Sequence, residues 1–235
     1  YGGGMNILLN REPSPVEIYN DLNGRIVNLF KVLREKPLQF LSLIYLTPCA
    51  REEYEKCYKE EFSDNADSDM ERARRVLTII TQSMSGRGLQ NRKVGWGHSI
   101  KGSQSQAKRW ANILTKLILA INRIKDVQIE NRPAVDVIKC YDTEDTLFYC
   151  DPPYVLSTRT GKDYEFEMTD EEHVKLSEVL HVVKGKVALS GYNCKLMEEL
   201  YSGWRRVKTV VSCPSSYAKN KKEKPDREEC LWMNY

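Results

Sequence analysis

The chain has 235 residues, of which 41% are hydrophobic and 29% are charged, and its formal net charge is +3. This length allows one substantial hydrophobic core with room for a smaller inserted domain. No apolar run approaches the roughly 20 residues that span a bilayer, and the first residues lack the charged and apolar regions of a secretion signal, so we expect neither a membrane protein nor a secreted one.

The seven cysteines are scattered without a C-x-x-C pair, and only three histidines accompany them. This pattern predicts neither a zinc site nor a disulfide framework. An odd number of dispersed thiols is typical of a reducing compartment, so we expect a cytoplasmic protein without a bound metal.

The first 35 residues alternate between helical and strand patterns. Residues 5–11 are compatible with a helix, and residues 16–19 alternate apolar and polar side chains as a short strand does. Apolar residues then recur at helical spacing from Asn23 to Arg34, with Asn23 as the predicted N-cap. This order of helix, strand and helix predicts an α/β fold.

The middle of the chain has a different composition. Residues 51–71 hold nine acidic and three basic side chains, whereas residues 72–125 hold twelve basic side chains and no acid. From the chain average, about seven or eight acids would be expected in the second stretch. Five glycines surround Trp96, and an apolar stripe from Trp110 to Ile124 predicts an amphipathic helix. We interpret residues 49–131 as a mostly helical insertion with a basic, glycine-rich loop.

The α/β pattern resumes after this insertion. Thr169 or Asp170 is the predicted cap of a helix that reaches Val182, and a second, short helix is expected at residues 195–201. A lysine-rich loop at residues 217–227 joins the last two predicted strands. The strands predicted in this part of the chain are 127–130, 147–150, 186–190, 205–212 and 229–235.

One predicted strand stops abruptly at Asp151-Pro152-Pro153-Tyr154. Two prolines cannot continue a β-ladder, so a rigid loop opens at the carboxyl end of the strand, where open α/β sheets place ligands. The amino group of a nucleic-acid base is a poor nucleophile because its lone pair is delocalised into the ring. A carboxylate and a proline carbonyl would accept the hydrogens of that group while the tyrosine ring stacks on the base. A simple turn is the alternative interpretation, because Asp and Pro dominate turns.

A second candidate site combines glycines with an acid. Gly2, Gly3 and Gly4 allow the backbone to approach a cofactor closely. Asp21 follows at the end of the first predicted strand, where a carboxylate would accept hydrogen bonds from ribose hydroxyls. A flexible chain end is the alternative interpretation of the glycines.

Several basic and aromatic residues are candidates for contact with nucleic acid. The stretch without acids suits phosphate contacts, which make binding dependent on salt. The lysine-rich loop and the segment after Tyr154 add further candidates, although basic residues also form solvated surfaces. The residues expected to bind nucleic acid are Arg87, Arg92, Lys93, Trp96, Lys101, Arg159 and Lys222.

Five motifs in order make the chain resemble the DNA adenine methylase family, particularly its phage-like members. In that family a glycine motif precedes a DNA-recognition insertion, which precedes Asp-Pro-Pro-Tyr, and the order here matches. The likeness spans nearly the whole chain and is loose between residues 50 and 110. The motifs are Tyr1-Gly2-Gly3-Gly4, Tyr19-Asn20-Asp21-Leu22-Asn23, Asp151-Pro152-Pro153-Tyr154, Ser190-Gly191-Tyr192 and Glu229-Cys230-Leu231-Trp232.

The resemblance implies an enzyme that moves a methyl group from S-adenosylmethionine (SAM) to the amino nitrogen of an adenine flipped out of double-stranded DNA. It implies a Rossmann-like SAM-binding catalytic domain over residues 1–48 and 132–235, and a target-recognition domain over residues 49–131. The enzyme would be a monomer in the cytoplasm of a bacterium or a phage-infected host.

The resemblance also implies a role for each residue of the two candidate sites. Asp21 would hold the SAM ribose, and Gly2 to Gly4 would line the cofactor pocket. Asp151 would contact both the cofactor and the target amine, the carbonyl of Pro152 would be the second acceptor, and Tyr154 would stack on the base.

Three alternatives remain open. The same amine chemistry would serve a methyltransferase that acts on cytosine or on RNA. Members of the family also carry SAM-contacting residues ahead of the position of Tyr1, and without them the chain would be a non-catalytic DNA-binding module. A nicotinamide-dependent oxidoreductase combines glycines with an acid as well, but it leaves Asp-Pro-Pro-Tyr unexplained.

Overall fold

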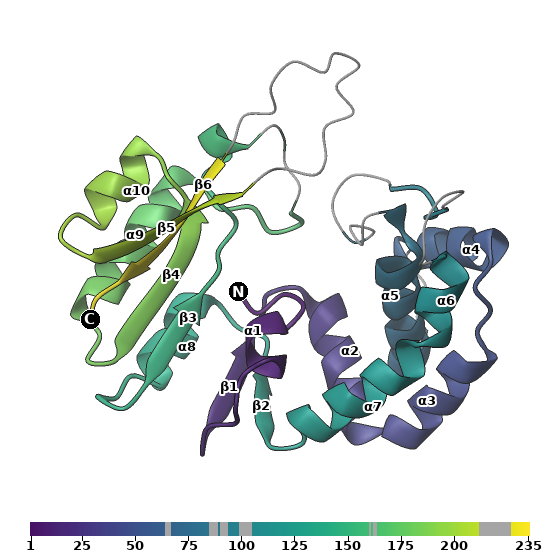
Figure 1. Ribbon diagram of the computed structural model, residues 1–235. Coiled ribbons are helices and arrows are strands. Elements are labelled where there is room, and N and C mark those ends of the chain that lie inside the picture. The colour runs from purple at the N-terminus through teal and green to yellow at the C-terminus, as the bar shows by residue number, and fades with distance from the viewer. Residues whose placement is uncertain are drawn as a thin grey trace, which may run out of the picture. The chain divides into compact units, whose positions relative to one another are not determined.

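The structure is a computed structural model that describes residues 1–63, 67–84, 89, 94–98, 105–159, 161, 164–211 and 227–235. The chain divides into two compact units. We call residues 3–132 the helical unit and residues 1–2 with 133–235 the sheet unit. Figure 1 shows the helical unit in purple to teal and most of the sheet unit in green to yellow.

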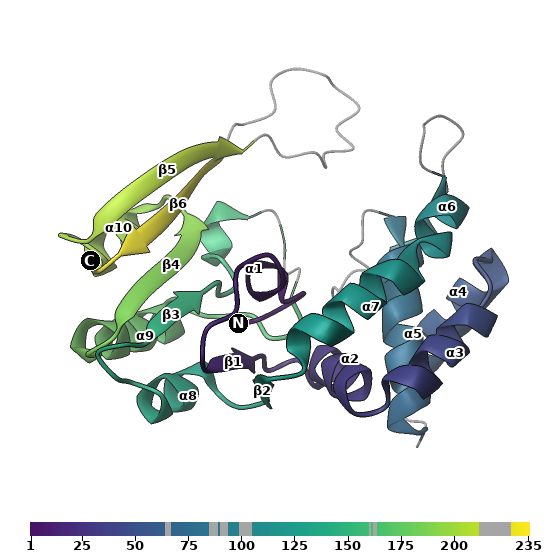
Figure 2. The same cartoon turned by 60° about the horizontal axis from the view of Figure 1, so that its bottom comes forward.

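The helical unit contains a two-stranded parallel sheet as well as helices. Strand β1 (Glu17–Asn20) pairs with β2 (Val127–Glu130), with Tyr19 opposite Ile129. Helices α2, α3, α5 and α7 are seen together in Figure 2. The helices are α1 (Asn6–Leu9), α2 (Gly24–Glu35), α3 (Pro37–Leu46), α4 (Arg51–Glu61), α5 (Asp69–Gln82), α6 (Gln106–Ala111) and α7 (Ile113–Ile124).

The apolar periodicity of the sequence accounts for the core of this unit. Helix α2 buries one face, and the side chain of Asn23 accepts a hydrogen bond from the Arg25 amide, which confirms the predicted N-cap. The predicted amphipathic helix is confirmed in character, but it is divided at Asn112 into α6 and α7. The buried members of its apolar stripe are Trp110, Leu117, Ile121 and Ile124.

Acidic and basic stretches that are neighbours in the sequence pair with each other in this unit. Arg74 of α5 forms ion pairs with Glu53 and Glu71. Arg75 lies near Glu61 and binds Asp67 at 2.7 Å between Nη2 and Oδ2. Part of the basic excess predicted for residues 72–125 is therefore neutralised inside the protein.

The sheet unit contains a mixed four-stranded sheet in the order β3-β4-β6-β5. Strand β3 (Leu147–Cys150) runs parallel to β4 (Lys186–Tyr192), and β6 (Arg227–Met233) is antiparallel to both β4 and β5 (Arg205–Val211). The strands predicted from the sequence are confirmed, with shifts of one or two residues at their ends. Figure 1 shows them beside α8 (Ala134–Cys140), α9 (Asp170–Val182) and α10 (Lys195–Leu200).

The core of the sheet unit lies between this sheet and its helices. Leu176 and Leu180 of α9 pack with Leu189 of β4 and Trp232 of β6, and all four are almost completely buried. Thr169 begins α9 with a reciprocal capping box with Glu172, so the cap predicted at Thr169 is confirmed.

The boundaries of the two units differ from those of the two predicted domains. Residues 3–48 belong to the helical unit because α2 packs on α5, with Asn28 Nδ2 donating to the Asp69 carbonyl at 2.9 Å. The α/β class is confirmed, with one sheet in each unit. A single Rossmann-like sheet and a separate recognition domain at residues 49–131 stay predictions.

Among the helices that the structure describes, none is long and apolar enough to cross a membrane.

Candidate active site

Asp151-Pro152-Pro153-Tyr154 begins where β3 ends. Cys150 is the last residue of β3 and is paired in register with Leu189 of β4, so Asp151 lies at the carboxyl end of β3 beside a strand that continues to Tyr192. The prolines leave the ladder there because they lack an amide hydrogen. The open loop predicted at this position is thus present.

The Asp151 carboxylate is held by the neighbouring strand. Ser190 Oγ of β4 donates a hydrogen bond to Asp151 Oδ1 at 2.7 Å. Loss of hydration raises the pKa of Asp151, and the hydrogen bond from Ser190 partly offsets that rise. The residue as a whole is exposed, while close neighbours limit the hydration of its carboxylate.

The Tyr154 ring is fixed at two points. Its hydroxyl donates to Glu229 Oε1 of β6 at 2.6 Å. Its ring meets that of Tyr192 edge to face, with centroids 4.6 Å apart and an interplanar angle of 77°. Burial, followed by the charge of Asp151, raises the pKa of Tyr154, so the hydroxyl keeps its proton and acts as the donor.

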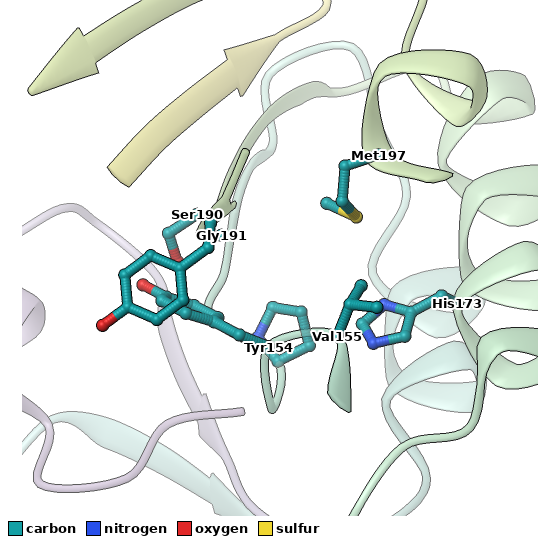
Figure 3. A pocket seen from close by; sticks show the side chains of 8 residues that line it. Tyr154, Val155, His173, Ser190, Gly191 and Met197 are labelled. Carbon is teal, nitrogen blue, oxygen red and sulfur yellow. The ribbon is translucent and has the colours of Figure 1, made fainter. Parts of the chain in front are cut away.

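A small pocket lies between the segment after β3 and the residues Ser190, Gly191 and Met197 (Figure 3). The side chain of His173 lines it and is 2% exposed. Burial lowers the pKa of His173, so the imidazole is neutral near pH 7. Other lining residues are Pro152 and Val155.

Arg159, predicted to contact nucleic acid, makes internal contacts. Its Nε donates to the Tyr154 carbonyl at 2.7 Å, and its guanidinium forms an ion pair with Glu167. The guanidinium also lies 5.1 Å from the centre of the Tyr164 ring. These contacts hold the segment that follows Tyr154, and a contact of Arg159 with nucleic acid stays a prediction.

Gly3 and Asp21 are in contact in the helical unit. The Gly3 amide donates to Asp21 Oδ2 and the Asn23 amide donates to Asp21 Oδ1, each at 2.8 Å. Tyr19 Oη donates to the Gly3 carbonyl at 2.8 Å. Gly3 has a φ of +46°, and a Cβ added there would meet no atom within 4 Å. The position has room for a side chain, but its backbone conformation favours glycine.

Trp96 lies in the helical unit against α4 and α5. Its indole nitrogen donates to Gln82 Oε1 at 3.3 Å, and the Arg51 guanidinium lies 5.0 Å from its ring centre. Its contact with nucleic acid stays a prediction. The other predicted contacts, Arg87, Arg92, Lys93, Lys101 and Lys222, lie outside the described residues.

Three residues near the motif received no role from sequence reasoning. Ser190 and Glu229 lie in motifs of the family resemblance, but only the strand register brings them to Asp151 and Tyr154. His173 has no metal-ligand spacing and reads as an ordinary histidine. The sequence places His173 in the first turn of α9, after the Thr169 cap, but this position alone did not indicate a contact with the Asp151–Tyr154 motif.

Comparison with known proteins identifies the class of this chain. Residues 1–213 match the family of D12 class N6 adenine-specific DNA methyltransferases, and the chain belongs to that family. It is 27% identical over 215 residues to the Type II methyltransferase M1.LlaDCHI of Lactococcus lactis subsp. cremoris. That match covers 85% of this chain and 72% of the relative. The predicted class of enzyme, an adenine-specific DNA methyltransferase, is confirmed.

Proposed function

We propose that this chain transfers a methyl group from SAM to the amino nitrogen of an adenine that is flipped out of double-stranded DNA. The observation that carries the proposal is the carboxylate of the exposed residue Asp151, which lies at the carboxyl end of β3 and accepts a hydrogen bond from Ser190. The Lactococcus relative is named a Type II methyltransferase, and we propose that this chain modifies a specific DNA site within a restriction-modification system.

Asp151 would act as hydrogen-bond acceptor for the target amine. With SAM bound as the methyl donor, the carboxylate would accept the proton that the amine loses on methylation and pass it to water. SAM supplies the electrophilic methyl group, so the protein's contribution is mainly position and charge. The Pro152 carbonyl would accept the second amine hydrogen.

The geometry at Asp21 fits a ribose. Each Asp21 oxygen already accepts one backbone amide, from Gly3 or Asn23, and retains a lone pair for a hydroxyl donor. These two bonds also fix the carboxylate, so little freedom would be lost when a ligand binds. We propose Asp21 as the ribose acceptor and the backbone of Gly2 to Gly4 as the lining of the cofactor pocket.

The flipped adenine would stack on Tyr154. An aromatic ring at the end of a strand suits an extruded base, and stacking contributes about 1–3 kcal/mol per base. Contacts with phosphates would offset the cost of unstacking. We assign these contacts to the predicted set of Arg87, Arg92, Lys93, Trp96, Lys101, Arg159 and Lys222.

Cofactor binding can be tested separately from catalysis. We expect Asp21→Ala to weaken SAM binding in calorimetry by about tenfold or more, because a charge-assisted hydrogen bond is lost. Asp126→Ala, at an exposed position of the same unit, is the control and should bind as the wild type does. If Asp21→Ala and Asp126→Ala bind SAM with equal affinity, Asp21 is not a residue of the cofactor site.

A further inference from the structure

We propose that Glu229 is a positioning residue for methyl transfer, which acts by holding the Tyr154 ring in the orientation that receives the adenine. The inference rests on the proposed function of Asp151 and Tyr154. The contact that carries it is the hydrogen bond of 2.6 Å from the Tyr154 hydroxyl to Glu229 Oε1. A bond between a protonated phenol and a carboxylate is charge-assisted and short, so it restrains the ring strongly.

The strand register places both restraints of Tyr154 at one level of the sheet. Glu229 of β6 is paired with Tyr192 of β4. Glu229 accepts a hydrogen bond from the hydroxyl of Tyr154, and the rings of Tyr154 and Tyr192 are in T-shaped contact. A ring held at its tip and on its side cannot rotate away without breaking both contacts. The pair is therefore suited to fix a stacking surface before the base arrives.

The neighbouring glutamate shows that this arrangement is specific to Glu229. Glu228 precedes it in β6, and adjacent residues of a strand point to opposite faces. Glu228 forms an ion pair with Lys208 of β5 at 2.9 Å between Oε2 and Nζ. Removing Glu228 alters a similar charge on the same strand without changing the support of Tyr154, which makes it a matched control.

Glu229 also changes the charge around Asp151. Its carboxylate raises the pKa of Asp151, in addition to the larger effect of lost hydration. The other groups that interact electrostatically with Asp151 are Tyr149, Cys150, Tyr154, Tyr164 and the amino group of Tyr1. A change at Glu229 should therefore be visible in the pH dependence of turnover as well as in its size.

The experiment measures transfer of tritiated methyl from SAM to DNA free of N6-methyladenine. We expect Glu229→Leu to lower kcat by about ten- to a hundredfold, because a misplaced reacting group costs this much, with a smaller change in KM for SAM. Glu229→Gln keeps an acceptor oxygen for the Tyr154 hydroxyl, so its kcat should fall less than that of Glu229→Leu. Glu228→Gln should retain the wild-type rate. Thermal unfolding identifies a variant that fails to fold, and the isosteric Gln variant then provides the test.

A double-variant cycle separates positioning from general damage. Tyr154→Phe removes the hydroxyl and keeps the ring, so Glu229→Leu should cause no further loss in a Tyr154→Phe background. Equal, additive losses in both backgrounds would overturn the inference. So would a Glu229→Leu variant with the same kcat as Glu228→Gln.

The pH profile gives a readout that a purely structural role would not change. Glu229→Gln removes a negative charge that raises the pKa of Asp151, so the acid limb of kcat/KM should move to lower pH. An unmoved limb, or one at higher pH, would contradict the inference. Asp151→Ala is measured in parallel. If Asp151→Ala retains turnover, the proposed function is wrong. If Asp151→Ala loses turnover but the Glu229 variants do not, only the role of Glu229 is wrong.

Discussion

At the scale of single residues, Asp151 is poised between two opposing influences. Reduced hydration raises its pKa above the ordinary 3.8, whereas the hydrogen bond from Ser190 lowers it. The catalytic role needs the charged carboxylate as an acceptor. Turnover should therefore fall as the pH drops through the pKa of Asp151, and the acid limb of kcat/KM should lie above 3.8.

Replacing Ser190 should shift the pKa of Asp151 in the direction opposite to that expected for Glu229→Gln. Ser190→Ala removes a hydrogen bond that favours the charged form, so the acid limb should move to higher pH, and kcat should fall by about ten- to a hundredfold. Ser177→Ala removes another buried serine, whose hydroxyl bonds the Val174 carbonyl within α9, and should leave the profile in place. A limb at lower pH in Ser190→Ala would refute the role given to Ser190.

The sequence predicted the Asp151-Pro152-Pro153-Tyr154 motif of the candidate site but not the residues that support it. A strand that ends in Asp-Pro-Pro-Tyr has local physical causes, and both the strand and the loop are present. The partners Ser190 and Glu229 are 39 and 75 residues away from the motif residues they bind. Only the pairing of β4 with β3 and β6 brings them near, and register is set by tertiary packing rather than by local pattern.

At the scale of elements, buried charges join α2, α4 and α5. Arg75 and Glu61 each have side chains that are 2% exposed, and Arg25 lies 3.1 Å from Glu61 between Nε and Oε1. Burial raises the pKa of Glu61, while its arginine neighbours lower it. The buried Glu61 charge thus depends on Arg75 and Arg25 for compensation.

Removing one member of this group should destabilise the helical unit. We expect Arg75→Met to lower the free energy of unfolding by about 3–5 kcal/mol, because it leaves Glu61 buried with less compensation. Urea denaturation measures the change, and Lys116→Met, at an exposed position of α7, is the control. A loss below about 1 kcal/mol would show that water or the remaining arginine compensates Glu61.

Helices with strong caps and apolar periodicity could be predicted from the sequence. The division of one predicted helix into two could not. The Asn23 and Thr169 caps follow from side chains that satisfy free amides at a helix start. The division of α6 from α7 at Asn112 left the apolar stripe uninterrupted, because both helices contribute to the same core. Periodicity alone therefore indicated one helix.

At the scale of the whole molecule, each unit carries a different part of the proposed chemistry. The sheet unit holds Asp151 and Tyr154 with their supports, and the helical unit holds Asp21 and the stretch that lacks acids. The composition of that stretch suggested a free basic surface. The structure shows that Arg74 and Arg75 are paired internally, which sequence counts could not reveal because pairing depends on how α4 packs on α5.

The central claim is that one carboxylate, at the end of β3, carries methyl transfer. Its most direct test compares Asp151→Ala with Asp145→Ala, an exposed aspartate in the turn before the same strand, for tritiated methyl incorporation and for DNA binding. We predict that Asp151→Ala loses about a thousandfold or more of its turnover while it binds DNA within about threefold of the wild type, and that Asp145→Ala behaves as the wild type. Turnover by Asp151→Ala within about tenfold of the wild type would contradict the account.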